Sequence, residues 1–352
     1  MTALAATLAQ IRAPDPRIAE ATQQLLDAKT KPRRSLGRLE DLACRVAAIR
    51  GSTAPAPLHK AIVVMGADHG VAAEGVSAFP QEVTRQMLLN FARGGAAINV
   101  LARHAGARLV VADLGVVEAL PDEPEIRADR IGPGTRNFAH GPAMTRGEAI
   151  AGLEAGIAIA RELAGAGVTL LGTGEMGIGN TTAASALAAV LTGAPPEEVT
   201  GRGTGIGDDG LARKLAVIRQ AIAVNRPDPE DPIDVLGKLG GFEIAGLAGL
   251  ILGGAAAGIP IVVDGFICGA AALVAIRLAP RAAGYLVGSH RSVEIGHRRV
   301  LAALGVEPLL DLELRLGEGT GAALAMPLVD AALGILRDMA TFAAAGVSDR
   351  DG

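Results

Sequence analysis

Short apolar runs that end in glycine or aspartate, each leading into an alanine-rich stretch, constrain the fold of this 352-residue chain more than any other feature. Continuous apolar runs of this length indicate strands buried on both faces of a parallel sheet. One further run alternates apolar and polar residues, as a strand with one wetter face does. The predicted strands are residues 61–66, 108–113, 168–172, 259–264, 283–288 and, for the alternating run, 308–316.

The sequence therefore predicts an α/β fold with a mostly parallel, Rossmann-like sheet that helices cover on both faces. Apolar residues also recur with helical spacing at 18–26, 36–49 and 324–345. We expect these terminal helices to form a smaller lobe, with residues 1–55 and 323–352 in the lobe and 56–322 in the α/β catalytic domain. Residues 121–146, rich in Pro, Gly and charge, are predicted to form an extended loop.

Composition excludes several classes of partner. A formal charge of −4 gives no electrostatic footprint for nucleic acid, and 2% aromatic residues argue against a base-stacking platform. The two cysteines, Cys44 and Cys268, are too few for a disulfide framework or a cysteine-rich zinc site. The N-terminus has no basic stretch followed by an apolar run, so we expect no signal peptide and a cytoplasmic protein.

One uncharged segment, residues 244–263, is long enough to cross a membrane. It is rich in glycine and alanine, and Pro260 divides it. We therefore predict a buried helix followed by a short strand, and no membrane association.

The strongest motif is the glycine-rich stretch 172–182, which follows a predicted strand and opens an alanine-rich helix. The dipole and free N–H groups of such a helix start bind anions, and glycines let a phosphate approach the backbone. Asn180, Thr181 and Thr182 are available to cap the first helical turn. This stretch is a candidate phosphate site.

Of three other interpretations of this stretch, the P-loop one fails and two remain open. Gly172-x-Gly174-x-x-Gly177 matches a dinucleotide fingerprint, although the acids about twenty residues later follow two prolines in a loop instead of ending a strand. Gly174-x-x-x-x-Gly179 begins like a P-loop, but Asn180 stands where the lysine must be. The glycines alternatively serve only close helix packing.

A second glycine cluster, residues 201–210, leads to Lys214. Arg202 and Lys214 are candidates to hold a phosphate or carboxylate, and Asp208 and Asp209 are placed to cap the next helix. Taken alone, Lys214 is more typical of a surface lysine.

Glu318 stands between glycines in residues 316–321, directly after the last predicted strand. At this edge of the sheet a carboxylate facing an apolar pocket has a raised pKa and can act as a general base near neutral pH. Spacing alone slightly favours a solvated loop glutamate instead. Asp68-His69 and the pair Glu294 and His297 lack the partners of a metal centre, and no serine-nucleophile elbow is present, so we expect no metal.

Taken together, these loops resemble the nicotinate-nucleotide:dimethylbenzimidazole phosphoribosyltransferase family of cobalamin biosynthesis. The matching stretches occur in the family's order and span about residues 31–330. They are 68–71, 82–87, 94–99, 174–182, 201–205, 263–266, 288–290 and 317–322.

The resemblance implies transfer of phosphoribosyl from nicotinate mononucleotide to 5,6-dimethylbenzimidazole. The products would be α-ribazole 5′-phosphate, with inversion at the anomeric carbon, and nicotinate. It assigns Glu318 as the general base, with Glu175 and Lys214 also at the active site. The phosphate and ribose would then be bound by Gly174, Gly177, Gly179, Asn180, Thr181, Arg202 and Gly203.

The resemblance also places part of an apolar slot for the benzimidazole at Phe79, Gln86 and Met87, with Gln86 as the polar contact. It implies a homodimer that needs neither a metal nor a cofactor. The alternative function is an NAD-dependent oxidoreductase that would use Gly172-x-Gly174-x-x-Gly177.

Overall fold

The computed structural model describes residues 2–121 and 123–348 and has the predicted α/β architecture. Its seven strands form one sheet in the order β3-β2-β1-β4-β5-β6-β7, and every neighbouring pair is parallel. The strands are β1 (Lys60–Ala67), β2 (Ala107–Gly115), β3 (Ile126–Ala128), β4 (Leu170–Met176), β5 (Ile261–Val263), β6 (Leu286–His290) and β7 (Pro308–Leu310).

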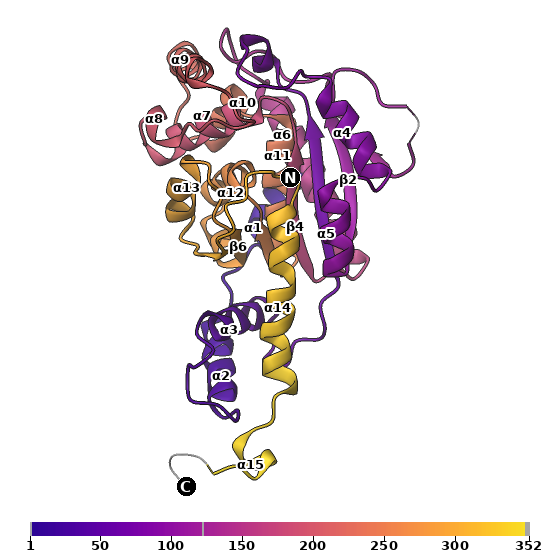
Figure 1. Ribbon diagram of the computed structural model, residues 1–352, viewed down its shortest axis with the longest axis vertical. Helices are drawn as coiled ribbons and strands as arrows, with labels where there is room; N and C mark the ends of the chain where they lie inside the picture. The colour runs from indigo at the N-terminus through magenta and orange to yellow at the C-terminus, as the bar shows by residue number, and fades with distance from the viewer. Residues whose placement is uncertain (1, 122, 349–352) are drawn as a thin grey trace.

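Helices cover both faces of the sheet (Figure 1). Alternate residues of β1 explain why this strand reads as an unbroken apolar run: Val63 and Met65 enter one core, and Ile62 and Val64 enter the other. The first core is closed mainly by α6 (Arg146–Gly165), α7 (Asn180–Thr192), α10 (Pro232–Leu239), α11 (Phe242–Ala256), α12 (Phe266–Leu278) and α13 (Gly296–Leu304). The second is closed by α3 (Arg38–Arg50), α4 (Val83–Ala92), α5 (Ala97–Ala105) and α14 (Thr320–Asp338).

The remaining helices are short or lie outside these two layers. They are α1 (Ala3–Gln10), α2 (Pro16–Asp27), α8 (Pro196–Val199), α9 (Asp208–Asn225) and α15 (Phe342–Ala345), with 3₁₀ turns at Gly70–Glu74 and Pro280–Tyr285.

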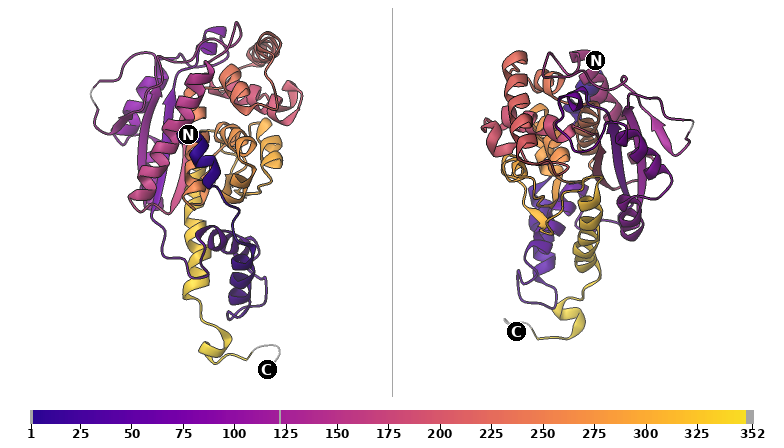
Figure 2. Two further views of the ribbon diagram at one scale, coloured as in Figure 1. Left: turned by 180° about the vertical axis from the view of Figure 1, so that it is seen from behind. Right: turned by 45° about the horizontal axis from the view of Figure 1, so that its top comes forward.

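Helix α14 links the sheet to a projecting group of helices (Figures 1 and 2). It begins at the carboxyl edge of the sheet, and farther along it packs against α2 and α3. An isolated bridge between Lys29 and Thr341 and a buried Lys31–Glu40 ion pair of 2.8 Å join these elements. Helix α1 instead packs against α6 and α11. The division into domains at 55/56 and 322/323 remains a prediction.

Several predicted elements differ from the structure. Residues 283–285 of the predicted strand 283–288 belong to the 3₁₀ turn Pro280–Tyr285, and the predicted helix 324–345 is divided because α14 ends at Asp338. Strand β7 ends at Leu310, because the chain beyond it turns outward: Leu312 and Leu316 are exposed and Glu313 has a φ of 55°. The predicted loop 121–146 contains the short edge strand β3, which pairs with β2. Three residues are too few to show a period, so this strand left no pattern in the sequence.

The uncharged segment 244–263 forms most of α11 followed by β5, and both are buried, as predicted. Among the described helices only α14 is long and apolar enough to cross a membrane. It packs against the sheet, α3 and α5, as the core helix of a globular domain does.

Candidate active site

A cavity of about 410 Å³ opens at the carboxyl edge of the sheet, where parallel α/β folds bind ligands. Side chains or loops that follow β4, β5, β6 and β7 contribute to its wall, and α4 closes one side. Its lining residues are Phe79, Val83, Met87, Glu175–Ile178, Asn180, Thr181, Gly203, Thr204, Gly265–Ile267, His290, Ser292, Glu294 and Arg315–Glu318.

Glu318 lies on a sharp turn between β7 and α14. Its φ is 62°, and those of Gly317 and Gly319 are 81° and 87°, so three consecutive residues are left-handed. This conformation is costly for a residue with a side chain, and such strain concentrates at functional sites. The turn buries the Glu318 carboxyl group, whose Oε2 accepts the N–H of Ile98 at 3.4 Å. Burial, with a smaller contribution from the negative charge of Asp264, raises the pKa of Glu318.

Asp264 holds this turn in place from the end of β5. Its Oδ2 accepts the N–H of Gly319 at 3.2 Å and its Oδ1 accepts that of Ala322 at 3.1 Å. A buried carboxylate therefore satisfies the first N–H groups of α14. No role for Asp264 was predicted from the sequence, although its position at the end of a predicted strand was a usable signal.

Glu175, the penultimate residue of β4, is the second buried carboxyl group of the cavity. Asn180 Nδ2 donates to its Oε2 at 2.5 Å. Burial raises the pKa of Glu175 to about 8, and the charges of Asp264, Glu243 and Glu318 add to the effect. Glu175 therefore holds a proton at neutral pH, which makes it a hydrogen-bond donor.

A second pair of titratable groups lies behind the loop that follows β4. His69 Nε2 and Glu243 Oε1 are 2.6 Å apart, and both side chains are fully buried. A Cβ at Gly177 would lie 3.1 Å from Glu243 Oε1, so the pair packs directly against the cavity wall. These residues are 174 positions apart in the chain, and their pairing had no sequence signal.

Lys214 on α9 is fully buried, so the interpretation of it as a surface lysine is wrong. Its Nζ donates to Thr181 Oγ1 at 2.9 Å and to the carbonyl of Gly201 at 3.4 Å. The ammonium group thus ties the two glycine-rich loops together. Burial lowers the pKa of Lys214 to about 8, against the opposing charge of Glu294.

The structure brings four of the predicted phosphate-binding residues to the cavity wall: Gly177, Asn180, Thr181 and Gly203. Gly174 and Gly179 are not among the lining residues, and Arg202 forms an ion pair with Asp208. The predicted side-chain caps are wrong, because the N-caps of α7 and α9 are Gly179 and Gly207.

The dinucleotide interpretation of the same stretch is also wrong. Gly172 and Gly174 lie inside β4, paired with Ile62 and Val64 of β1, and not in the turn where that fingerprint places its glycines.

Two of the three predicted base-binding residues line the cavity. Phe79 and Met87 line the cavity together with Val83, and they give this side of it an apolar wall. Gln86 is exposed on α4 and is not among the lining residues. Val83 and Met87 are four residues apart and share one helix face, whereas Gln86 lies at the edge of that face.

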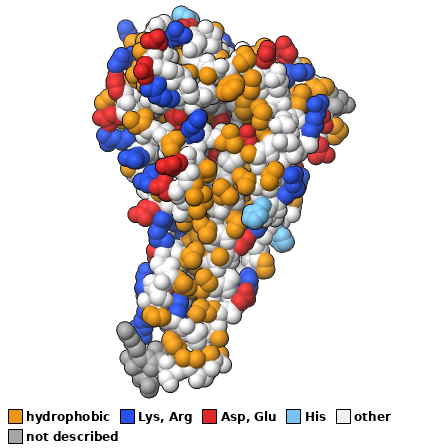
Figure 3. Space-filling view, viewed as in Figure 1, with side chains coloured by type: hydrophobic (Ala, Val, Ile, Leu, Met, Phe, Trp, Pro, Cys, Tyr) orange, Lys and Arg blue, Asp and Glu red, His pale blue; other side chains and the backbone are white. Residues whose placement is uncertain are grey.

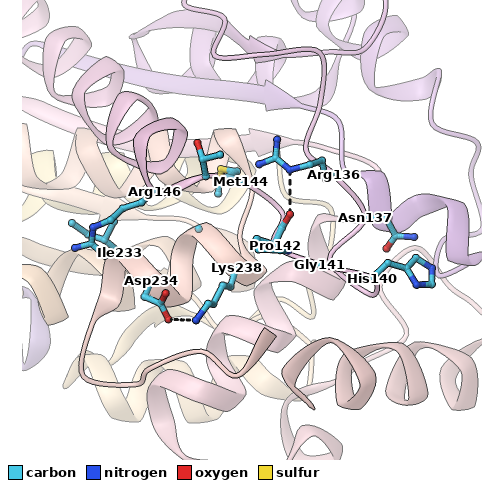
Figure 4. Close-up of a pocket in the computed structure, with 12 residues that line it drawn as sticks. Arg136, Asn137, His140, Gly141, Pro142, Met144, Arg146, Ile233, Asp234 and Lys238 are labelled. Carbon is cyan, nitrogen blue, oxygen red and sulfur yellow. Dashed lines mark hydrogen bonds and ion pairs between the residues drawn. The ribbon is translucent and has the colours of Figure 1, made fainter. Parts of the chain in front are cut away.

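A larger cavity of about 530 Å³ lies elsewhere, between residues 136–146 and α10 (Figure 4). Its cationic side chains are already paired: Arg136 with Glu148 at 2.7 Å, Arg146 with Asp231 at 2.6 Å, and Lys238 with Asp234 at 2.8 Å. It lacks the buried carboxyl groups of the sheet-edge cavity. We therefore place the candidate active site at the sheet edge.

The raised pKa of Glu175 predicts a pH dependence of stability. Its folded pKa of about 8 exceeds the ordinary 4.5, so between these values the folded state binds the extra proton and rising pH lowers the free energy of unfolding. Glu175→Gln removes this decrease in the free energy of unfolding, which is up to about 1.4 kcal/mol per pH unit. Urea unfolding at about pH 6 and about pH 7.5 should show the variant gaining about 1–2 kcal/mol relative to the wild type. Equal changes in the free energy of unfolding of the two proteins between these pH values would contradict the raised pKa of Glu175.

Comparison with known proteins shows similarity along nearly the whole chain. A family model described as phosphoribosyltransferase matches residues 11–347. A protein of Geobacter metallireducens named nicotinate-nucleotide–dimethylbenzimidazole phosphoribosyltransferase is 58% identical over 347 residues, which cover 99% of this chain and 98% of that relative. A Roseiflexus protein of the same name is 56% identical over 350 residues, 99% of each chain. The crystal structure of CobT from Thermus thermophilus matches with a TM-score of 0.91 and 52% identity, over 94% of this chain and 99% of that one.

Proposed function

The chain belongs to the nicotinate-nucleotide–dimethylbenzimidazole phosphoribosyltransferase family, and from this premise we propose that it transfers phosphoribosyl from nicotinate mononucleotide to 5,6-dimethylbenzimidazole. The products are α-ribazole 5′-phosphate, for the lower nucleotide loop of cobalamin, and nicotinate. The observation that carries this proposal is the buried Glu318 carboxyl group, held on a left-handed turn in the wall of a largely apolar cavity.

The reaction requires one bond to form, one to break and one proton to be removed. The unprotonated benzimidazole nitrogen attacks the anomeric carbon while the bond to the pyridinium nitrogen breaks, and inversion follows from attack opposite the leaving group. The bonding electrons neutralise the pyridinium, so the leaving group needs no acid. The second benzimidazole nitrogen carries the proton that must leave. Glu318 accepts it as general base, a contribution of about 10²–10⁴ in rate.

The remaining parts of the cavity suit the two substrates. The start of α7 and the loop at Gly203 offer backbone to the 5′-phosphate, as helix N-termini do for anions. Phe79, Val83 and Met87 offer an apolar wall to the dimethylated ring. Glu175, protonated at neutral pH, adds no negative charge beside Glu318.

We also propose a cytoplasmic homodimer. Helix α14 turns apolar side chains outward at helical spacing, and hydrophobic side chains gather along its length in Figure 3. Next to it on α5, Val100 is 55% exposed. Accessible apolar stripes of this kind are typical of protein–protein contacts. On α14 the stripe consists of the half-buried Leu324, Pro327, Leu328 and Ile335 and the exposed Ala331.

Replacing Lys214 should affect the nucleotide more than the acceptor base. Lys214→Met keeps the volume of the side chain but removes the ammonium group that joins Thr181 to Gly201. We expect the KM for nicotinate mononucleotide to rise about tenfold, since a hydrogen bond to a charged group is worth about 1.5–3 kcal/mol. The KM for dimethylbenzimidazole should change much less. Lys238→Met, which breaks an ion pair away from the sheet-edge cavity, is the control. Equal rises in KM for both substrates would contradict a role of Lys214 in nucleotide binding.

A further inference from the structure

Glu294, in the connection between β6 and α13, is a cavity residue with a buried carboxylate oxygen that has no hydrogen-bond donor among the described residues. It lines the sheet-edge cavity and is 9% exposed. No N–H or O–H group in the described part of the chain donates to its Oε2, which is buried. A carboxylate removed from water needs replacement donors. The missing donors are therefore expected from a ligand.

The backbone around Glu294 is fixed by a short network. Ser292 N donates to His297 Nδ1 at 2.9 Å, and Glu294 N donates to Ser292 Oγ at 3.3 Å. The carbonyl of Glu294 accepts the N–H of His297 at 2.9 Å. Burial lowers the pKa of His297 to about 3, so its ring stays neutral and keeps Nδ1 as an acceptor. The backbone that carries the unsatisfied carboxylate is thus fixed before any ligand binds.

Glu294 stands where the two glycine-rich loops meet. Its Oε2 lies against Gly201, the residue whose carbonyl accepts from Lys214. Thr181 and Gly203, one from each loop, line the cavity beside it. The charge of Glu294 acts on the Lys214 ammonium group, but the two are not within ion-pair distance, and the ammonium group already donates to Thr181.

The chemistry of the proposed substrates leaves one kind of donor for this carboxylate. The phosphate and the nicotinate carboxylate only accept hydrogen bonds at neutral pH. The single N–H of the benzimidazole is the proton that Glu318 removes. The ribose 2′- and 3′-hydroxyl groups remain, and they are neutral donors of the kind that a buried carboxylate binds well.

We propose that Glu294 accepts hydrogen bonds from the ribose hydroxyl groups of the nucleotide and so selects ribonucleotide over deoxyribonucleotide substrates. This role rests on the proposed function. It places the sugar between the phosphate loops and Glu318, with its hydroxyl groups directed to the β6–α13 connection. Glu294 is then a substrate-binding residue that both orients the anomeric carbon and completes its own hydrogen bonding.

The test compares nicotinate mononucleotide with its 2′-deoxy and 3′-deoxy analogues, using the wild type, Glu294→Ala and the near-isosteric Glu294→Gln. For the wild type, we expect removal of the bonded hydroxyl to lower kcat/KM about 10- to 100-fold, the range for a hydrogen bond to a charged group. Glu294→Ala should lower kcat/KM for the ribonucleotide by a similar factor. It should lower kcat/KM little further for the analogue that lacks the bonded hydroxyl, because the two changes remove the same contact. Glu307→Ala, at a side chain that is 85% exposed, is the control and should leave kcat/KM for the ribonucleotide and for both analogues unchanged.

Two outcomes would overturn the role of Glu294. The first is a wild type with the same kcat/KM for the ribonucleotide and both deoxy analogues. The second is a variant that loses the same factor in kcat/KM with all three nucleotides, because the losses from the two changes are then independent. Glu294→Gln tests the same point if the alanine variant does not fold, since its amide removes the charge and keeps the shape. If the wild type forms no ribotide from nicotinate mononucleotide and dimethylbenzimidazole, the proposed function is refuted. If it forms the ribotide but the losses from the variant and the analogue are independent, only the contact between Glu294 and the ribose is refuted.

Discussion

Glu318→Gln should lower kcat for ribotide formation at least about 100-fold while binding of nicotinate mononucleotide persists. The amide keeps the size of the side chain, so the left-handed turn and the N–H contact from Ile98 should survive. What it loses is the ability to take the benzimidazole proton. Steady-state kinetics and nucleotide titration by calorimetry check the two halves of this expectation.

Glu313→Gln is the matched control, because Glu313 also has a positive φ but is exposed on the chain segment that precedes the turn. Its kcat should stay within about twofold of the wild type, as for most exposed surface changes. Full activity of Glu318→Gln would show that proton removal needs no protein base. Loss of nucleotide binding in that variant would mean that the turn serves binding and not proton transfer.

Gly174→Ala should disable the site from a position that does not line it. A Cβ at Gly174 would lie 2.6 Å from the carbonyl oxygen of Glu318 and 2.9 Å from Gly319 N, and backbone cannot yield as a flexible side chain does. The Glu318 turn must therefore move away from β4. A displacement of about 1 Å costs about 100-fold in rate, and overpacking of this kind costs about 1–3 kcal/mol in stability.

Gly165→Ala controls for the added methyl group, because no atom lies within 4 Å of the Cβ that it adds at the end of α6. We expect wild-type kcat for the control and a loss of about 100-fold for Gly174→Ala at a temperature where circular dichroism shows both variants folded. Equal activity of the two variants would mean that the close approach of β4 does not determine where Glu318 lies.

The strands were predictable because burial on both faces leaves no choice of residue type. Val63, Met65, Ile62 and Val64 of β1 must all be apolar, and glycine or aspartate marks where such a strand ends. The predicted position of Glu318 at the ligand-binding edge followed from the same logic, since glycines flank it directly after a strand signal.

The partners across the site could not be predicted, because they depend on sheet order. Asp264 reaches Gly319 only because the connection from β7 brings the start of α14 back over β4 and β5, and His69 meets Glu243 only because α11 packs against β1. Short-range errors had a different origin. Arg202 has an acid, Asp208, six residues later that pairs with it, and Gln86 is exposed at the edge of the helix face that Val83 and Met87 share. The charge spacing contained the first fact, whereas the helical period alone does not exclude Gln86, which is three residues from Val83.

The most direct measurement incubates the purified protein with nicotinate mononucleotide and 5,6-dimethylbenzimidazole, and follows the mixture by chromatography. We predict equal amounts of α-ribazole 5′-phosphate and nicotinate, with the Glu318→Gln variant at least about 100-fold slower. Absence of the ribotide from the wild-type mixture, or its formation at an unchanged rate by the variant, would contradict the proposed role of Glu318 in this reaction.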